Sequence, residues 1–126
     1  MTANRLLIVD DTLIMRMKIK EIAVQAGWSI VAEASNGREA VELFRQHQPE
    51  MVTLDMVMPE MDGLAALKAI RAIDPQARVV MVSAVDQKAK LNECIMSGAI
   101  DFIVKPFDSA RLSAFFTRYR KDDPVD

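Results

Sequence analysis

Three aspartates in the sequence directly follow or end short apolar runs. Asp10 and Asp11 come after the run 6–9, and Asp55 closes the run 51–55. Runs of this length and composition favour buried strands of a parallel sheet over helical turns. In open α/β sheets, ligands bind at the carboxyl ends of the strands, so a carboxylate there is a candidate for chemistry. Considered alone, each aspartate is better explained as a turn residue that closes a strand.

Two further polar residues stand at the ends of apolar runs. Ser83 follows the run 79–82, and Lys105 ends the run 102–105. A lysine at a strand end can reach across the sheet edge and neutralise phosphoryl oxygens with its ammonium group. A serine there can donate one hydroxyl hydrogen bond. Each residue alone is more simply a solvated charge or a turn residue, but five fitting residues at four strand ends make chemistry at this edge the better hypothesis.

Strand-like and helix-like segments alternate five times along the chain. The predicted strands cover 6–9, 28–34, 51–55, 78–83 and 102–105. The predicted helices follow them, over 15–26, 36–48, 62–74 and 86–97, and the last helix begins near Asp108. Because the strands are apolar without alternation, this order predicts a parallel sheet covered by helices on both faces. We expect a doubly wound, flavodoxin-like (βα)5 fold with the strand order 2-1-3-4-5.

Apolar residues at helical spacing predict which face of each helix is buried. The third predicted helix places Leu64, Leu67, Ile70 and Ile73 on one face, the fourth places Leu91 and Ile95, and the last places Leu112, Phe115, Phe116 and Tyr119. Asn36 and Glu39 have the spacing of a capping box at the start of the second helix. Gly27 stands where the end of the first helix favours a left-handed residue.

Length and composition predict a single domain over residues 1–126, with a core of its own. The chain is 51% hydrophobic and 27% charged, as in soluble globular proteins. No apolar run approaches the ~18 residues of a membrane span, and the start lacks a secretory signal, so we expect a cytoplasmic protein. A net charge of −2 gives no electrostatic case for nucleic-acid binding. Cys94 is predicted to be a core thiol, and His47 to lie near a helix C terminus rather than to bind a metal.

The predicted strand order brings the three aspartates together. The first and third strands are neighbours in it, which places Asp10, Asp11 and Asp55 in one crevice. At an effective dielectric constant of about 20, two carboxylates ~4 Å apart repel by ~4 kcal/mol, so the cluster requires a cation. Oxygen ligands completed by water, without histidine or thiolate, fit Mg²⁺ better than zinc or a closed calcium cage. Magnesium at such a site indicates phosphate chemistry.

With these residues in place, the sequence resembles the receiver domain of bacterial two-component response regulators. The matching motifs are Val9-Asp10-Asp11, Asp55 followed by Met58-Pro59, Asp62-Gly63, Ser83-Ala84 and Lys105-Pro106-Phe107. They agree with the family in order, spacing and predicted strand position, and they cover essentially the whole chain. We therefore expect residues 1–126 to be one receiver domain with no output domain. Within the family the chain is most similar to the stand-alone chemotaxis regulators of the CheY type, which share this strand order.

The resemblance implies a phosphoacceptor site. Asp55 would take a phosphoryl group from the phosphohistidine of a histidine kinase. Asp11, Asp55 and the backbone carbonyl of Val57 would bind Mg²⁺, with Asp10 acting largely through water, and Lys105 would hold the phosphoryl group. Such a protein is a phosphoacceptor that assists its own phosphorylation and dephosphorylation rather than an enzyme.

The resemblance also implies a switch and a set of partners. Ser83 would move its hydroxyl to the phosphoryl group while Phe102 turns inward, and the bond before Pro106 would be cis. The partners implied are a CheA-like histidine kinase, a target such as a flagellar motor switch component, and a phosphatase; we expect a monomer. Val57 and Val85 are apolar where family members often carry polar groups that affect dephosphorylation, which leaves the lifetime of the phosphorylated form open.

Three other function classes share some of these features. A phosphohydrolase of the haloacid dehalogenase type would need an acid two residues after its first-strand nucleophile, where this chain has Thr12. A flavodoxin would need a loop rich in hydroxyl groups and glycine in place of Asp10 and Asp11. Within the receiver family, a phosphorelay intermediate or a fragment of a transcriptional regulator remains an alternative. The absence of an output domain favours a protein that acts by docking.

Overall fold

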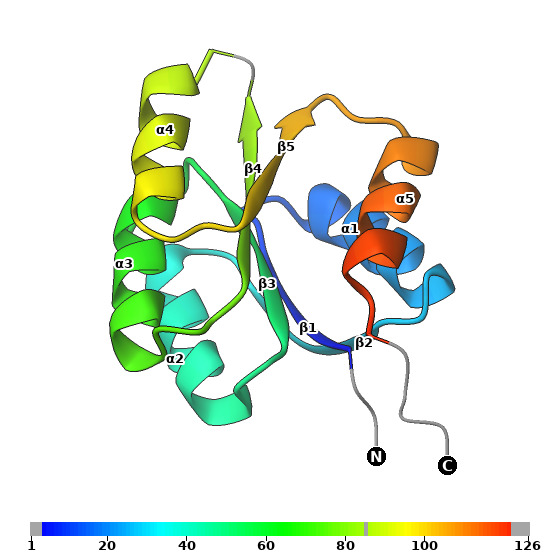
Figure 1. Ribbon diagram of the computed structural model, residues 1–126, viewed down its shortest axis with the longest axis horizontal. Coiled ribbons are helices and arrows are strands. Elements are labelled where there is room, and N and C mark those ends of the chain that lie inside the picture. The colour runs from blue at the N-terminus through cyan, green and yellow to red at the C-terminus, as the bar shows by residue number, and fades with distance from the viewer. Residues whose placement is uncertain (1–3, 85, 122–126) are drawn as a thin grey trace.

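The fold is a parallel sheet between two layers of helices, as seen in a computed structural model that describes residues 4–84 and 86–121 (Figure 1). The strands are β1 (Arg5–Val9), β2 (Ser29–Ala34), β3 (Met51–Asp55), β4 (Val79–Ala84) and β5 (Asp101–Lys105). The helices are α1 (Leu13–Gln25), α2 (Gly37–His47), α3 (Gly63–Ile73), α4 (Lys88–Met96) and α5 (Ser109–Tyr119). The sheet order is β2-β1-β3-β4-β5, which confirms the predicted fold class and topology.

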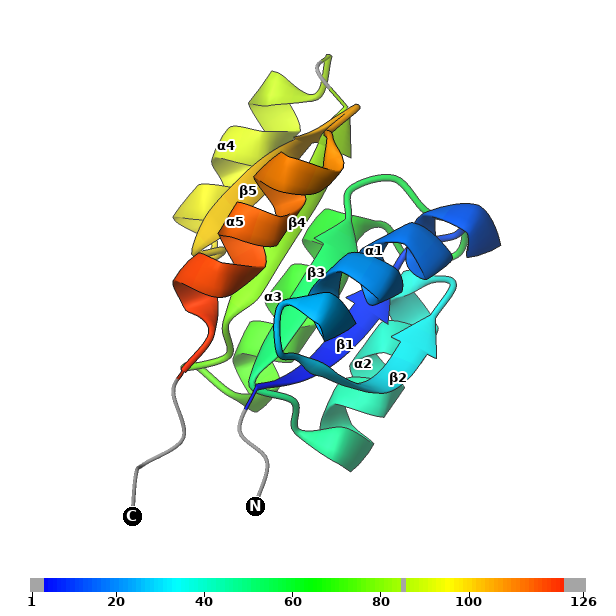
Figure 2. The same ribbon diagram turned by 90° about the vertical axis from the view of Figure 1, so that its right-hand side faces the viewer.

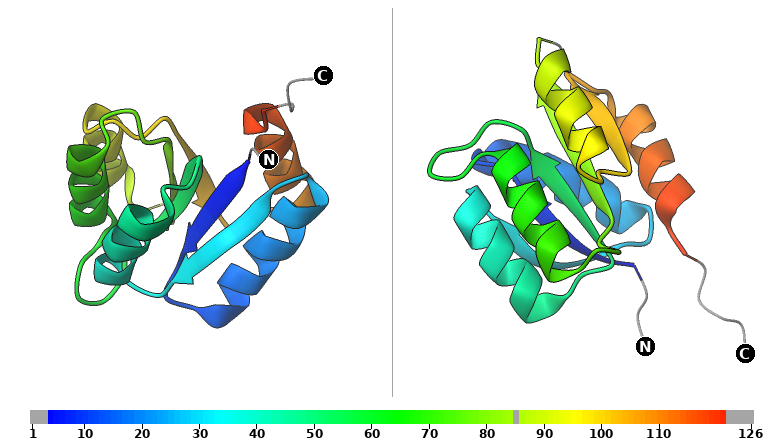
Figure 3. Two further views of the ribbon diagram at one scale, coloured as in Figure 1. Left: turned by 90° about the horizontal axis from the view of Figure 1, so that it is seen from below. Right: turned by 60° about the vertical axis from the view of Figure 1, so that its left-hand side comes forward.

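The helices cover the two faces of the sheet unequally. In Figure 2, α1 and α5 lie together on one face, and the right-hand view of Figure 3 shows α2, α3 and α4 side by side on the other. Each face has its own core, with Leu6, Ile8, Ile19, Leu112 and Phe116 on the α1/α5 side and Leu7, Leu54, Phe44, Ile70 and Met81 on the other. Because alternate residues of β1, β3 and β4 point to opposite faces, these central strands are apolar along most of their length. No described helix is both long and apolar enough to cross a bilayer.

The strand register aligns the carboxyl ends of β1 and β3. Val9 pairs with Leu54, so Asp10 and Asp55 are the next residues along two neighbouring strands. Strand β4 lies on the other side of β3 and pairs with β5 so that Ala84 is opposite Lys105. The register therefore brings the acids and the lysine to one edge of the sheet.

The helix ends follow the predicted local signals. Asn36 accepts a 2.8 Å hydrogen bond from the backbone N–H of Glu39, and Gly27 takes the predicted left-handed conformation with φ +98°. The Glu39 carboxylate accepts from the backbone N–H of Ser35 at 2.8 Å, one residue before the expected partner. The cap at Asn36 thus forms, while the return bond of the capping box is shifted by one residue.

The predicted burial of two residues and the predicted start of one helix were wrong. Ile73, the last residue of α3, is 38% exposed, and Ile95 is 41% exposed where it lines a pocket beside Phe102 of β5. The fourth helix begins at Lys88 rather than Asp86, and no side chain caps it. Cys94 is fully buried, as predicted. Val85, which was singled out in the sequence, lies outside the described residues.

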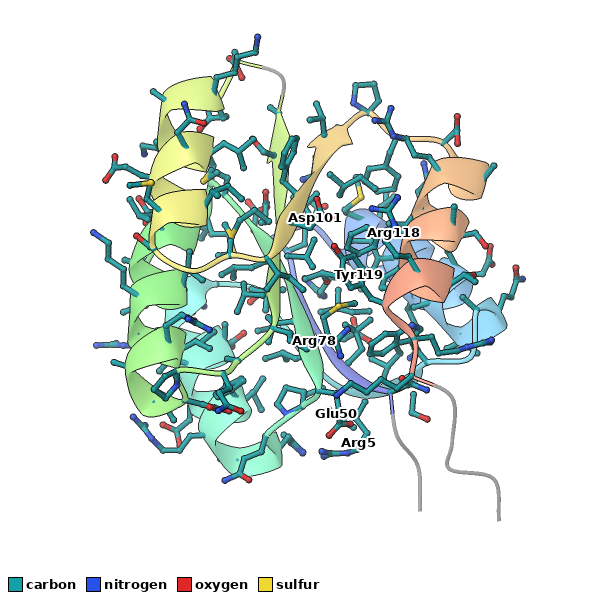
Figure 4. All side chains as sticks on the ribbon, viewed as in Figure 1. Arg5, Glu50, Arg78, Asp101, Arg118 and Tyr119 are labelled. Atoms are coloured by element: carbon teal, nitrogen blue, oxygen red, sulfur yellow. The ribbon has the colours of Figure 1, made fainter. Side chains whose placement is uncertain are left out.

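Polar contacts attach the C-terminal end of α5 to the sheet (Figure 4). The guanidinium of Arg78 donates to the backbone carbonyl of Tyr119 at 2.8 Å. The Tyr119 hydroxyl donates to the carboxylate of Asp101 at 2.6 Å, and Arg118 lies 3.7 Å from the same carboxylate. This end of α5 is therefore held to the amino ends of β4 and β5, far from the acid cluster.

The first residue of α3 packs directly on the backbone of the central aspartate. Gly63 donates its N–H to the carbonyl of Met56 at 2.9 Å. A Cβ atom at this position would collide with the carbonyl oxygen of Asp55 and lie 2.8 Å from the Cα atom of Met56. The close approach of α3 to the end of β3 therefore requires glycine.

We expect Gly63→Ala to lower the free energy of unfolding by about 1 kcal/mol. Overpacking costs about 1–3 kcal/mol, and the better helix propensity of alanine offsets part of that cost. Urea unfolding of parent and variant measures the difference. Lys68→Ala, at an exposed position of the same helix, is the control and should stay within about 0.5 kcal/mol of the parent. Equal midpoints for Gly63→Ala and the parent would contradict the close packing.

Candidate functional site

The three aspartates singled out in the sequence meet at one edge of the sheet. Asp10 and Asp11 follow β1, and Asp55 is the last residue of β3. One carboxylate oxygen of each lies within 4.8 Å of the others. Asp10 is fully buried and Asp55 is 6% exposed, whereas Asp11 is exposed to solvent. The predicted convergence is therefore found, with two buried acids beneath one that is open to solvent.

Asp10 is held through all four of its polar atoms. Its backbone N–H donates to the carbonyl of Ala34 at 3.0 Å, and its own carbonyl accepts from Arg16 at 2.7 Å. One carboxylate oxygen accepts from the backbone N–H and the hydroxyl of Thr12, at 2.9 and 3.0 Å. The other accepts from Lys105 at 3.1 Å. Asp10 is thus a fixed support for the site.

Lys105 offsets part of the charge of the two buried acids. Its ammonium lies 3.1 Å from Asp10 and 3.4 Å from Asp55. Burial alone would lower the pKa of Lys105, but Asp55 and Asp10 raise it above its usual value. Burial, followed by the charge of Asp10, raises the pKa of Asp55 to about 6, although Lys105 opposes this shift. One lysine therefore does not neutralise the cluster, which leaves room for a second cation.

The donor set fits Mg²⁺. The acids offer only oxygen atoms, and the exposed Asp11 leaves the crevice open for water ligands. Within the described residues, the backbone carbonyl of Val57 accepts no hydrogen bond, so it is free to act as a further oxygen ligand. No histidine or cysteine belongs to the cluster. These are the properties that distinguish a magnesium site from a zinc site.

Ser83 is buried, whereas the ring of Phe102 is exposed to solvent. Ser83 is fully buried, and its hydroxyl donates to the carbonyl of Ala84 at 3.0 Å. The side chain of Phe102 is 44% exposed. It lines a pocket of about 280 Å³ together with Leu91 and Ile95 of α4. Phe102 therefore lies beside a pocket between α4 and β5.

The loop after β5 has the predicted cis bond between Lys105 and Pro106. The following residue, Phe107, is held by Lys18 of α1. The ammonium of Lys18 donates to the carbonyl of Phe107 at 3.3 Å and lies 5.0 Å from the centre of its ring. Sequence reasoning missed both Lys18 and Arg16, because each acts on a backbone carbonyl and no motif marks such a contact.

We expect Asp55→Asn to be more stable than the parent without Mg²⁺. The pKa of Asp55 is about 6 in the folded protein against an ordinary 3.8, so the folded state carries the cost of the charge above pH 6. That cost disappears as the pH falls from about 6 to about 4. Urea unfolding in EDTA should show a gain of roughly 2 kcal/mol at pH 7.5 and almost none near pH 4. A gain in unfolding free energy that is independent of pH would mean that Asp55 is not the titrating group. Glu60→Gln, which removes an exposed acid, is the control.

Comparison with known proteins agrees with this site. The sequence model of the response regulator receiver domain matches residues 6–117. The chemotaxis protein CheY of Bacillus subtilis is 54% identical over 110 residues, which cover 87% of this chain and 92% of that protein. CheY of Thermotoga maritima is 50% identical over 109 residues, covering 86% and 91%. The solved CheX-CheY-BeF3-Mg complex of Borrelia burgdorferi contains a similar chain, with a TM-score of 0.86, 36% identity and coverage of 94% of this chain and 90% of that one. The chain described here therefore belongs to the response regulator receiver domain family.

Proposed function

We propose that this receiver domain is switched by phosphorylation of Asp55. The observation that carries the proposal is the acid cluster, in which oxygens of Asp10, Asp11 and Asp55 lie within 4.8 Å of one another. Lys105 completes the site with its ammonium 3.4 Å from Asp55. A carboxylate at an open sheet edge, beside a cation and a set of oxygen ligands, is suited to accept a phosphoryl group.

In the proposed reaction, a carboxylate oxygen of Asp55 attacks the phosphorus of a phosphohistidine in line with the leaving nitrogen. The P–N bond breaks as the P–O bond of an acyl phosphate forms, and water later cleaves that P–O bond. Asp11, Asp55 and the Val57 carbonyl would hold Mg²⁺, with Asp10 acting through water. When bound, Mg²⁺ supplies positive charge to the phosphoryl oxygens. Lys105 supplies the second positive charge, and most of the catalysis is positioning and electrostatics. The domain would thereby assist both its phosphorylation and its dephosphorylation.

The proposed output is a change at the surface formed by α4, β5 and α5. The phosphoryl oxygens offer the Ser83 hydroxyl a charged acceptor in place of the Ala84 carbonyl that it now contacts. Movement of this hydroxyl would allow Phe102 to enter the pocket beside Leu91 and Ile95. The phosphoryl group shifts the equilibrium because it interacts differently with the two arrangements.

The similarity to CheY supports a place in chemotaxis. We propose a CheA-like histidine kinase as the phosphodonor and a protein target, such as a flagellar motor switch component, as the partner of the phosphorylated form. The Borrelia complex contains CheX bound to CheY with BeF3 and Mg, so a CheX-like protein is also a candidate partner. A phosphorelay intermediate is the alternative within the family. Phosphotransfer from Asp55 to a second histidine-containing protein would favour it.

With acetyl phosphate and Mg²⁺, we expect the parent protein to gain one phosphoryl group and Asp55→Asn to gain none. The amide cannot act as the nucleophile that forms an acyl phosphate. Intact-mass spectrometry measures the gain. Glu60→Gln removes an exposed carboxylate from the loop after β3 and should be labelled like the parent. Equal labelling of Asp55→Asn would move the acceptor to another residue.

We expect Ser83→Ala to accept phosphate at Asp55 but to transmit the change poorly. In an NMR titration with beryllofluoride and Mg²⁺, its chemical-shift changes around Phe102, Leu91 and Ile95 should be much smaller than those of the parent. The variant lacks the hydroxyl that is proposed to move toward the phosphoryl group. Ser109→Ala, at an exposed position of α5, should retain the full shifts. Undiminished shifts in Ser83→Ala would exclude the hydroxyl as the transmitter.

A further inference from the structure

We propose that Arg16 is a positioning residue for the metal site, acting through the peptide group that joins Asp10 to Asp11. This inference rests on the proposed function, in which these acids hold Mg²⁺. Arg16 contacts neither carboxylate in the described structure. Its guanidinium donates instead to the backbone carbonyl of Asp10, at 2.7 Å.

The contact is well placed to orient Asp11. The Asp10 carbonyl belongs to the same planar peptide group as the Asp11 N–H, so holding this oxygen sets the direction in which the chain enters Asp11. Among the described residues, no side chain hydrogen-bonds the carboxylate of Asp11, which is exposed. Its position therefore depends on the backbone before it. Mg²⁺ demands near-ideal octahedral geometry, so a small rotation of this peptide group weakens binding.

Arg16 is itself fixed from its other side. Its Nε atom donates to the carboxylate of Glu33 on β2 at 3.2 Å, and only 15% of the Arg16 side chain is exposed. Lys20, one turn further along α1, lies 3.6 Å from the same carboxylate. The planar guanidinium can bind Glu33 and the Asp10 carbonyl at once in a fixed geometry, whereas a lysine offers one flexible ammonium. The result is a link from β2 through α1 to the turn that carries the metal ligands.

The charge of Arg16 and its positioning role should change Mg²⁺ affinity in opposite directions. A positive charge near the acid cluster opposes the binding of a cation, so removing that charge alone should strengthen Mg²⁺ binding. Loss of the link to the Asp10 carbonyl should weaken it, since partners beyond the direct ligands typically contribute about 10–100-fold to metal affinity. The direction of the change in Arg16→Met therefore separates the two roles.

The test is a calorimetric titration of the full chain with MgCl2, for the parent and four variants. We expect Arg16→Met to bind Mg²⁺ about tenfold more weakly and Arg16→Lys to recover part of the loss. Lys20 carries the same charge as Arg16 and contacts the same Glu33, but it does not contact Asp10. The Mg²⁺ affinity of Lys20→Met should therefore be unchanged or slightly higher than that of the parent. Asp11→Ala provides the reference for loss of a direct ligand.

A second readout needs no metal. In ¹⁵N relaxation measurements without Mg²⁺, the amide of Asp11 should be more mobile in Arg16→Met than in the parent or in Lys20→Met. If Arg16→Met does not fold, Arg16→Lys decides, and its affinity and Asp11 mobility should still differ from those of the parent. Mg²⁺ binding in the folded Arg16 variants that is as tight as in the parent, or tighter, would overturn the positioning role. A parent that does not bind Mg²⁺ would overturn the proposed function itself.

Discussion

Repulsion between carboxylates on neighbouring strand ends is the constraint on which the rest of the site depends. Asp10 and Asp55 are both buried, and the pairing of β1 with β3 brings them together. Their charge is tolerated because Lys105 reaches both, yet the raised pKa of Asp55 shows that the compensation is partial. Added positive charge therefore stabilises the site, and an added negative charge perturbs it.

Periodicity in the sequence was sufficient to predict the fold class, and the assumed strand order then predicted that the acids converge. Apolar runs without alternation indicate parallel strands buried on both faces, and a parallel sheet brings its strand ends to one edge. With the strand order 2-1-3-4-5, Asp10, Asp55 and Lys105 are therefore expected at the same edge of the sheet. Their sequence separation carries no such information, since it is the order of the strands that makes them neighbours.

Side-chain contacts with the backbone were beyond the reach of sequence reasoning. Arg16 and Lys18 each bind a carbonyl oxygen in a different loop of the site, and a carbonyl is present at every residue. Ile73 and Ile95 fit the helical spacing but are 38% and 41% exposed, and a repeat in the sequence does not show how much of each helix its neighbours cover. These features depend on distances between elements rather than on the pattern within one.

The burial of Cys94 has a practical consequence for observing this protein at work. Its thiol lies 3.6 Å from the sulfur of Met56, and burial raises its pKa to about 11, so it stays protonated and shielded from alkylating reagents near neutral pH. Because Cys94 is the one cysteine in the sequence, the native chain should react very little with thiol reagents. A cysteine introduced at Met96, which is 88% exposed at the end of α4, would accept a spin label or fluorophore selectively. Movements of the α4 surface could then be followed in real time with the native thiol left in place.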